Sequence, residues 1–382
     1  MDLSTIRRTP DVEGPGLSAS DAADRLILDE AAPYLARAAG VPGALVVVGD
    51  THGALTLSLI ADQDATSVRV HQDAVLGERA ILANAEQLGL ARAVQVQSAG
   101  PSLVRDARVV LMRLPRSLDA LDELTTLVAD HAAPDVVVVA GGRLKHMSTA
   151  MNDVLRRRFG RLDVSHARQK SRVLIARDPQ PATAAGAPWP RRTHDTALDL
   201  DVVAHGGVFA GAAVDIGTRF LLAELDAQLA GPAPAPPRTA VDLACGTGIV
   251  AVELARRFPT ARIVATDQSA AAVTSARATA AANGLDGRIE VVRGDGLEFA
   301  DEASVDLIAL NPPFHAGAAV TTALAERLFA DCGRALAPGG LAVVVWNSHL
   351  RYRPALERLI GPTTQLARNP KFTVTVSTRT AG

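Results

Sequence analysis

The feature that most constrains the fold of this chain is an internal repeat. An apolar run, a glycine turn and an apolar helix start surround Gly53 and again surround Gly248. A second pair of matching segments ends at Gly89 and at Gly284, and the residues of each pair lie 195 positions apart. One constant shift across two elements indicates a duplication. Because strands alternate with helices in both halves, we predict two α/β units with parallel, doubly wound sheets.

The two copies differ where a ligand would bind. Under the same shift, four residues of the second copy are replaced in the first: Asp242 by Val47, Gly246 by Thr51, Asp267 by Gln72 and Asn311 by Arg116. We interpret the first half as a degenerate copy kept for stability or substrate contact, with an unrelated α/β domain as the alternative. A stretch rich in Pro, Ala and Gly separates the halves. We therefore predict domains at 1–180 and 196–382, joined by a linker at 181–195.

Composition narrows the class of protein. Apolar residues make up 48% and charged residues 21% of the 382-residue chain, as in globular proteins, and the apolar runs are too short to cross a bilayer. The net charge of −2 is weak evidence against broad nucleic-acid binding, although it allows a local basic patch. Only Cys245 and Cys332 occur, without metal-ligand spacing, and no signal peptide is visible. We expect a cytoplasmic protein with no metal and no membrane contact.

The segment around Gly246 predicts a cofactor loop in the second half. Gly246 and Gly248 allow a tight turn between a strand and the helix predicted at 249–257. The N–H groups of that helix start would face the ligand. The next strand ends at Asp267, about 20 residues after the loop, which is the spacing at which a carboxylate reaches ribose hydroxyls.

The details of the loop favour S-adenosylmethionine (SAM) over a nicotinamide dinucleotide. The third glycine of the dinucleotide motif is absent, since position 251 is Ala. Asp242 precedes the loop, where it would repel a pyrophosphate but could meet the amino group of a cationic cofactor. Asp295, followed by Gly296, comes after a third strand at 289–293 and could accept from the adenine amine. A helix cap or a turn is the alternative role for each carboxylate.

Asn311-Pro312-Pro313-Phe314 follows an apolar strand and predicts the reaction site. An exocyclic or amide NH2 is a weak nucleophile, because its lone pair is delocalised. The side-chain oxygen of Asn311 and the carbonyl of Pro312 could accept its hydrogens and aim the lone pair at a methyl donor, without a strong base. Phe314 could stack on a planar target. The alternative is an ordinary Asn-Pro turn with a core Phe.

The second half resembles the bacterial ribosomal RNA guanine-N2 methyltransferases, which have two tandem class I methyltransferase-like domains. The resemblance covers the chain from Gly207 to its end and is carried by the segments 207–209, 215–222, 242–248, 311–315, 347–352 and 371–372. It implies two Rossmann-like domains, the first degenerate, and methyl transfer from SAM to a guanine N2 in ribosomal RNA. It also implies that segment 215–217 helps to close over the cofactor, and that Asn311 and Phe314 hold the base.

These arguments yield a set of expected functions and residues. Catalysis is assigned to Asn311, Pro312, Pro313 and Phe314. The expected SAM contacts are Asp215, Gly217, Thr218, Asp242, Ala244, Cys245, Gly246, Gly248, Asp267, Gln268, Asp295, Gly296 and Asn311. The expected partner is ribosomal RNA or a ribosomal subunit, bound by a monomer.

Several alternatives stay open at this point. The acceptor could be adenine N6 or a protein glutamine amide, the chain could be a noncatalytic RNA-binding assembly protein, and a nicotinamide-dependent oxidoreductase is a more distant possibility. The arginines and lysine at 156–158, 161, 168, 170 and 172 could contact RNA phosphates, or they could form a solvated basic face.

Overall fold

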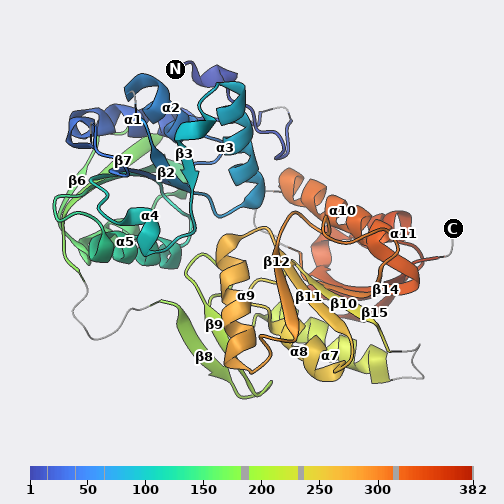
Figure 1. Ribbon diagram of the computed structural model, residues 1–382. Coiled ribbons are helices and arrows are strands. Elements are labelled where there is room, and N and C mark those ends of the chain that lie inside the picture. Colours follow the sequence, from blue (N-terminus) through green and yellow to red (C-terminus); the bar gives the residue numbers. More distant parts are fainter. Residues whose placement is uncertain are drawn as a thin grey trace. The chain divides into compact units, whose positions relative to one another are not determined.

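The computed structural model describes residues 1–14, 16–38, 40–63, 65–181, 189–230, 236–312 and 318–380. The chain forms two compact units, Met1–Trp189 and Pro190–Gly382 (Figure 1). Within the described ranges, no helix is both long and apolar enough to cross a membrane. Residues 191–195, at the end of the predicted linker, form a strand of the second unit.

The first unit is a seven-stranded sheet with helices on both faces. Its strands lie in the order β3-β2-β1-β4-β5-β7-β6. The strands β1 to β5 are parallel, and β7 runs antiparallel to both β5 and β6. The elements are α1 (Ala22–Leu35), β1 (Leu45–Val48), α2 (Ala54–Gln63), β2 (Val68–His71), α3 (Val75–Gln87), β3 (Val94–Val96), α4 (Pro101–Val104), β4 (Val109–Arg113), α5 (Leu118–His131), β5 (Val137–Arg143), α6 (Ala150–Arg156), β6 (Phe159–Val164) and β7 (Ser171–Pro179).

The second unit repeats this topology, which confirms the predicted duplication. Its strands lie in the order β12-β11-β10-β13-β14-β16-β15, and the hairpin of β8 and β9 precedes them. The elements are β8 (Arg191–Asp195), β9 (Leu200–Ala204), α7 (Ile216–Ala230), β10 (Thr239–Leu243), α8 (Ile249–Arg257), β11 (Arg262–Asp267), α9 (Ala270–Ala282), β12 (Ile289–Arg293), β13 (Val305–Leu310), α10 (Ala318–Ala335), β14 (Leu336–Asn347), α11 (Arg353–Leu359), β15 (Thr363–Arg368) and β16 (Phe372–Thr378).

The repeat extends to the segments that lead into each unit, although their sequences give no sign of it. In the first unit, Asn84 of α3 accepts from the backbone N–H of Arg7 at 3.0 Å and donates to the Arg7 carbonyl at 2.8 Å. In the second unit, Thr279 of α9 makes the same pair of bonds with Val203, at 3.0 and 3.1 Å. Both leading segments are therefore bonded to the same helix of the fold through side chains at equivalent positions.

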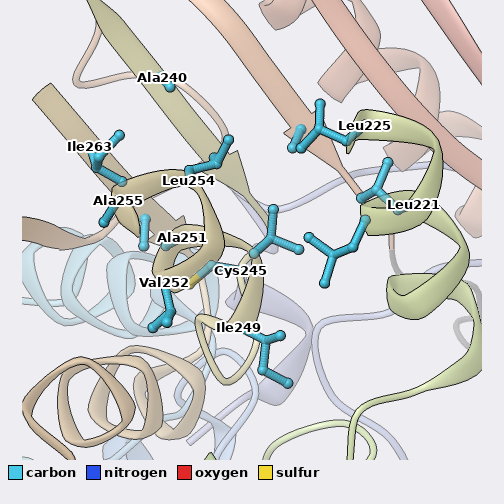
Figure 2. Close-up of a cluster of buried hydrophobic side chains, with 14 of the residues drawn as sticks. Leu221, Leu225, Ala240, Cys245, Ile249, Ala251, Val252, Leu254, Ala255 and Ile263 are labelled. Atoms are coloured by element: carbon cyan, nitrogen blue, oxygen red, sulfur yellow. The ribbon is translucent and has the colours of Figure 1, made fainter. Parts of the chain in front are cut away.

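Apolar side chains cover both faces of the second sheet. One cluster joins Leu221 and Leu225 of α7 to Leu254 of α8 and to Ile263 of β11 (Figure 2). The opposite cluster includes Phe329, Cys332 and Leu356 from α10 and α11. Both faces are thus occupied by helices, so only the ends of the strands remain for polar side chains. Ligands bind in such sheets beyond the carboxyl ends of the strands.

Candidate active site

The loop between β10 and α8 is shaped by three residues with left-handed backbone. Ala244, Gly246 and Gly248 have φ angles of 58°, 54° and 76°. A Cβ atom on Gly248 would lie 2.9 Å from Cβ of Ala276 on α9, so this glycine lets the loop approach the helix. The N–H of Cys245 donates to the carbonyl of Thr266 at 3.0 Å, which ties the loop to β11. The predicted helix 249–257 has the bounds of α8.

Two carboxylates hold this loop and the first turn of α8. Asp267, half-buried at the end of β11, accepts from the N–H of Gly246 at 3.0 Å through Oδ2 and from that of Ser269 at 2.9 Å through Oδ1. Asp242 is only 3% exposed and accepts from the N–H of Ala251 at 3.0 Å. Burial raises the pKa of Asp242 to about 7, with a smaller contribution from the charge of Asp267. Asp242 therefore lies inside the junction of loop and helix, and its contact with a cofactor amine stays a prediction.

The turn after β12 carries the third predicted acid. Asp295 is 19% exposed and forms an ion pair with Arg327 of α10. The carbonyl of Asp267 accepts from the N–H of Gly294 at 3.1 Å, which holds the turn beside β11. Gly296 has a φ angle of 56°, as a tight turn requires. The partner Arg327 was missed by sequence reasoning, because no local pattern marks it. Contact of Asp295 with an adenine amine stays a prediction.

Asn311 begins the loop after β13, and its side-chain amide is held by residues from the start of α7. The Nδ2 group of Asn311 donates to Oγ1 of Thr218 at 3.1 Å and to Oδ2 of Asp215 at 3.4 Å. Thr218 also donates its hydroxyl hydrogen to Oδ2 of Asp215. Pro312 is buried. The other two predicted catalytic residues, Pro313 and Phe314, lie outside the described residues.

Sheet register brings these polar groups to one edge. Leu243 pairs with both Thr266 and Leu310, and Thr266 pairs with Val292. The four strands are parallel, so the glycine loop, Asp267, the turn at Asp295 and Asn311 follow adjacent strand ends about 5 Å apart. The predicted contacts Ala244, Cys245 and Gln268 belong to the same edge, where Cys245 is buried and the other two are half-buried.

The polar groups at this edge fit the predicted cofactor. The half-buried carboxylates Asp267 and Asp295 suit a ligand with hydroxyl and amino donors and a positive centre. They do not suit a pyrophosphate, because like charges would repel. A Cβ atom on the left-handed Gly246 would meet nothing within 4 Å, so a ligand could approach this part of the loop closely.

The same edge of the first unit is closed by its own side chains. Asp50 accepts from the N–H groups of Gly53 and Thr56 at 3.1 and 2.8 Å. Arg113, at the end of β4, forms ion pairs with Asp21 at 2.8 Å and with Asp24 at 2.6 Å. Asp24 is 1% exposed, and burial raises its pKa to about 6 although Arg113 opposes the shift. Polar groups there satisfy one another, as expected of a degenerate copy.

The basic residues near the end of the first unit are mostly paired with acids. Arg157 lies 2.9 Å from Asp122, and Arg161 lies 3.2 Å from Asp163. Arg156, Arg168 and Arg177 also form ion pairs, with Asp153, Asp29 and Asp163. Such exposed pairs contribute little to stability, but they lower the net positive charge. This arrangement favours the solvated basic face over a strong phosphate-binding patch.

Comparisons with known proteins agree with this geometry. Residues 2–180 match the family described as RLMG N-terminal domain, and residues 199–376 match the methyltransferase small domain. A protein of Streptomyces coelicolor named ribosomal RNA large subunit methyltransferase G is 37% identical over 97% of this chain and 96% of its own length. A protein of the same name from Pseudomonas putida is 33% identical over 98% of this chain and 96% of its own.

The fold also matches a solved structure. The 16S rRNA N2 methyltransferase RsmC of T. thermophilus, in complex with AdoMet and guanosine, superimposes with a TM-score of 0.71 at 22% identity, covering 96% of this chain and 97% of the other. Fold and site together define a class I SAM-dependent methyltransferase with tandem domains. Within that class, the chain belongs to the ribosomal RNA large subunit methyltransferase G family.

Proposed function

We propose that this enzyme methylates the exocyclic N2 of a guanine in large-subunit ribosomal RNA. The observation that carries the proposal is the carboxamide of Asn311 at the sheet edge that also holds the glycine loop. The names of the relatives support ribosomal RNA of the large subunit, and the guanosine complex of the structural neighbour supports guanine.

The chain's own residues would act by positioning. The side-chain oxygen of Asn311 and the carbonyl of Pro312 accept hydrogen bonds from the two N2 hydrogens. This contact draws the N2 lone pair out of conjugation with the ring and aims it at the methyl donor. Asp267 and the loop at Gly246–Gly248 would hold SAM, and Phe314 would stack on the base. When bound, SAM supplies a methyl carbon on a cationic sulfur: N2 bonds to that carbon, the C–S electron pair stays on sulfur, and an N2 proton passes to water. No strong base is required.

We assign catalysis to the second domain, 196–382, and substrate contact or stabilisation to the first domain, 1–180. The two domains have the same topology, but only the second has Asp267 and Asn311 at its strand ends, where the first has Gln72 and Arg116. We also propose that the enzyme acts as a monomer. The substrate, ribosomal RNA, implies that it works in the cytoplasm.

Labelled SAM and ribosomal RNA from cells that lack this enzyme provide the test. The wild-type protein should transfer label, and digestion of the RNA should yield labelled N2-methylguanosine. Label in N6-methyladenosine or in protein glutamine would identify another acceptor, and the absence of label from every RNA and protein would refute the proposal. Asn311→Ala should abolish turnover while SAM affinity, measured by calorimetry, stays within about threefold of wild type.

A further inference from the structure

The hydrogen bonds around Asp215 leave this carboxylate fully occupied. Its Oδ1 accepts from the N–H of Gly217 at 2.8 Å and from that of Thr218 at 3.3 Å. Its Oδ2 accepts from the hydroxyl of Thr218 and from Nδ2 of Asn311. An ionised carboxylate offers about four lone-pair sites, and four donors fill them. Asp215 is therefore saturated by its own chain, and a ligand donor would have to displace one of these bonds.

Hydrogen counting also determines which end of the Asn311 amide faces this cluster. Thr218 has one hydroxyl hydrogen, and Asp215 accepts it, so Oγ1 of Thr218 presents only lone pairs to Asn311. Rotating the amide by half a turn would place its oxygen against two acceptors, Oγ1 of Thr218 and Oδ2 of Asp215. That arrangement is repulsive, so the NH2 end must point toward the cluster and the oxygen must point away from it.

The backbone of the cluster has no room for adjustment. A Cβ atom on Gly217 would lie 3.0 Å from Oδ1 of Asp215, 3.3 Å from Cε1 of Phe372 and 3.5 Å from Nδ2 of Asn311. Thr218 is 8% exposed and Phe372 is 6% exposed. The start of α7 is therefore packed closely against Phe372 of β16, with Asp215 and Thr218 beside the Asn311 amide.

We propose that Asp215 and Thr218 are positioning residues, which lock the Asn311 carboxamide with its oxygen toward the acceptor nitrogen. This inference rests on the proposed function, because it concerns how the N2 amine is held. It differs from a role in holding SAM, which predicts weaker cofactor binding when these residues change. Locking the amide excludes the orientation in which the NH2 of Asn311 faces the NH2 of the guanine. In that orientation the two donors would repel each other.

Thr218→Val is the central variant, because it keeps the shape of the side chain and removes the acceptor and the donor. We expect kcat for N2-methylguanosine formation to fall about tenfold, since the amide loses the hydrogen bond to Thr218 that fixes its orientation. The dissociation constant for SAM, measured by calorimetry, should change less than about twofold. Thr218→Ser, which retains the hydroxyl, should restore most of kcat.

A matched control is available in the same domain. Thr375 of β16 is 1% exposed, and its hydroxyl has no hydrogen-bond partner within the described part of the chain, so Thr375→Val should leave kcat and SAM affinity unchanged. A Thr218→Val enzyme with wild-type kcat, or one whose loss is entirely in SAM affinity, would overturn the inference while the proposed function stands. A wild-type enzyme that forms no N2-methylguanosine would instead refute the proposed function, and the inference with it.

Discussion

Gly248 is the position where the cofactor loop depends most directly on tertiary packing. Its φ angle is 76°, and an added Cβ would lie 2.9 Å from Cβ and 3.1 Å from Cα of Ala276. Ala276 is 2% exposed and has no side-chain torsion that could relieve the contact, so α9 would have to move. Gly284 has a similar φ angle of 69°, but a Cβ atom there would meet nothing within 4 Å.

Comparing Gly248→Ala with Gly284→Ala separates two contributions to the loss of stability, namely backbone strain and overpacking. Left-handed backbone costs a non-glycine residue about 1–2 kcal/mol at either position. Overpacking adds about 1–3 kcal/mol, and it does so only at position 248. We therefore expect Gly248→Ala to lower the free energy of unfolding by about 2–5 kcal/mol and Gly284→Ala by about 1–2 kcal/mol.

Urea unfolding followed by tryptophan fluorescence can measure this difference. The chain contains two tryptophans, so a Trp189→Phe background leaves the buried Trp346 to report on the second domain. Gly248→Ala should also weaken SAM binding, because the loop must shift with the helix. Equal destabilisation by the two variants, within about 0.5 kcal/mol, would refute the argument that close approach to Ala276 requires glycine here.

Two further outcomes follow from the same structure. Burial raises the pKa of Asp242 to about 7, from an ordinary value near 3.8, so the folded state holds its proton more tightly than the unfolded state. Stability should consequently fall as pH rises from about 4 to about 7, and Asp242→Asn should flatten that part of the profile in pH-dependent urea unfolding. Calorimetric titration of the full chain with SAM should give one site per molecule. At the corresponding edge of the first domain, Arg113 is paired with Asp21 and Asp24, and Asp50 accepts from backbone N–H groups. Two SAM sites per molecule would contradict the conclusion that the first domain has no cofactor site at this edge.

Local patterns were sufficient for much of the second domain. Helix 249–257 and the strand ending at Asp267 were predicted with the bounds that the structure has, because glycine turns and apolar periodicity act over a few residues. The constant shift of 195 residues predicted the duplication, and the two sheets have the same strand order. Parallel strands then place residues that follow them at one edge, so the grouping of Asp267, Asp295 and Asn311 could also be inferred.

The sequence did not predict which residues would pair with individual side chains. Asp295 pairs with Arg327, and the predicted basic cluster is partly neutralised by acids such as Asp122 and Asp163. Asp242 stands just before the glycine loop, where a ligand contact is expected. It is nevertheless only 3% exposed and lies at the junction of the loop and α8. A carboxylate in a motif can face either a ligand or a backbone N–H, and only the packing around it decides between them.

By itself the sequence determined that this chain folds as two copies of one α/β plan and that the second copy has a glycine loop, acids at strand ends and an Asn-Pro turn. Only the tertiary structure decided that Asp215 and Thr218, more than ninety residues before Asn311, hold its amide in one orientation. The physical reason is the separation along the chain over which each kind of interaction acts. Backbone turns and apolar periods are set by neighbouring residues, whereas the direction of a hydrogen bond depends on which distant segments pack together.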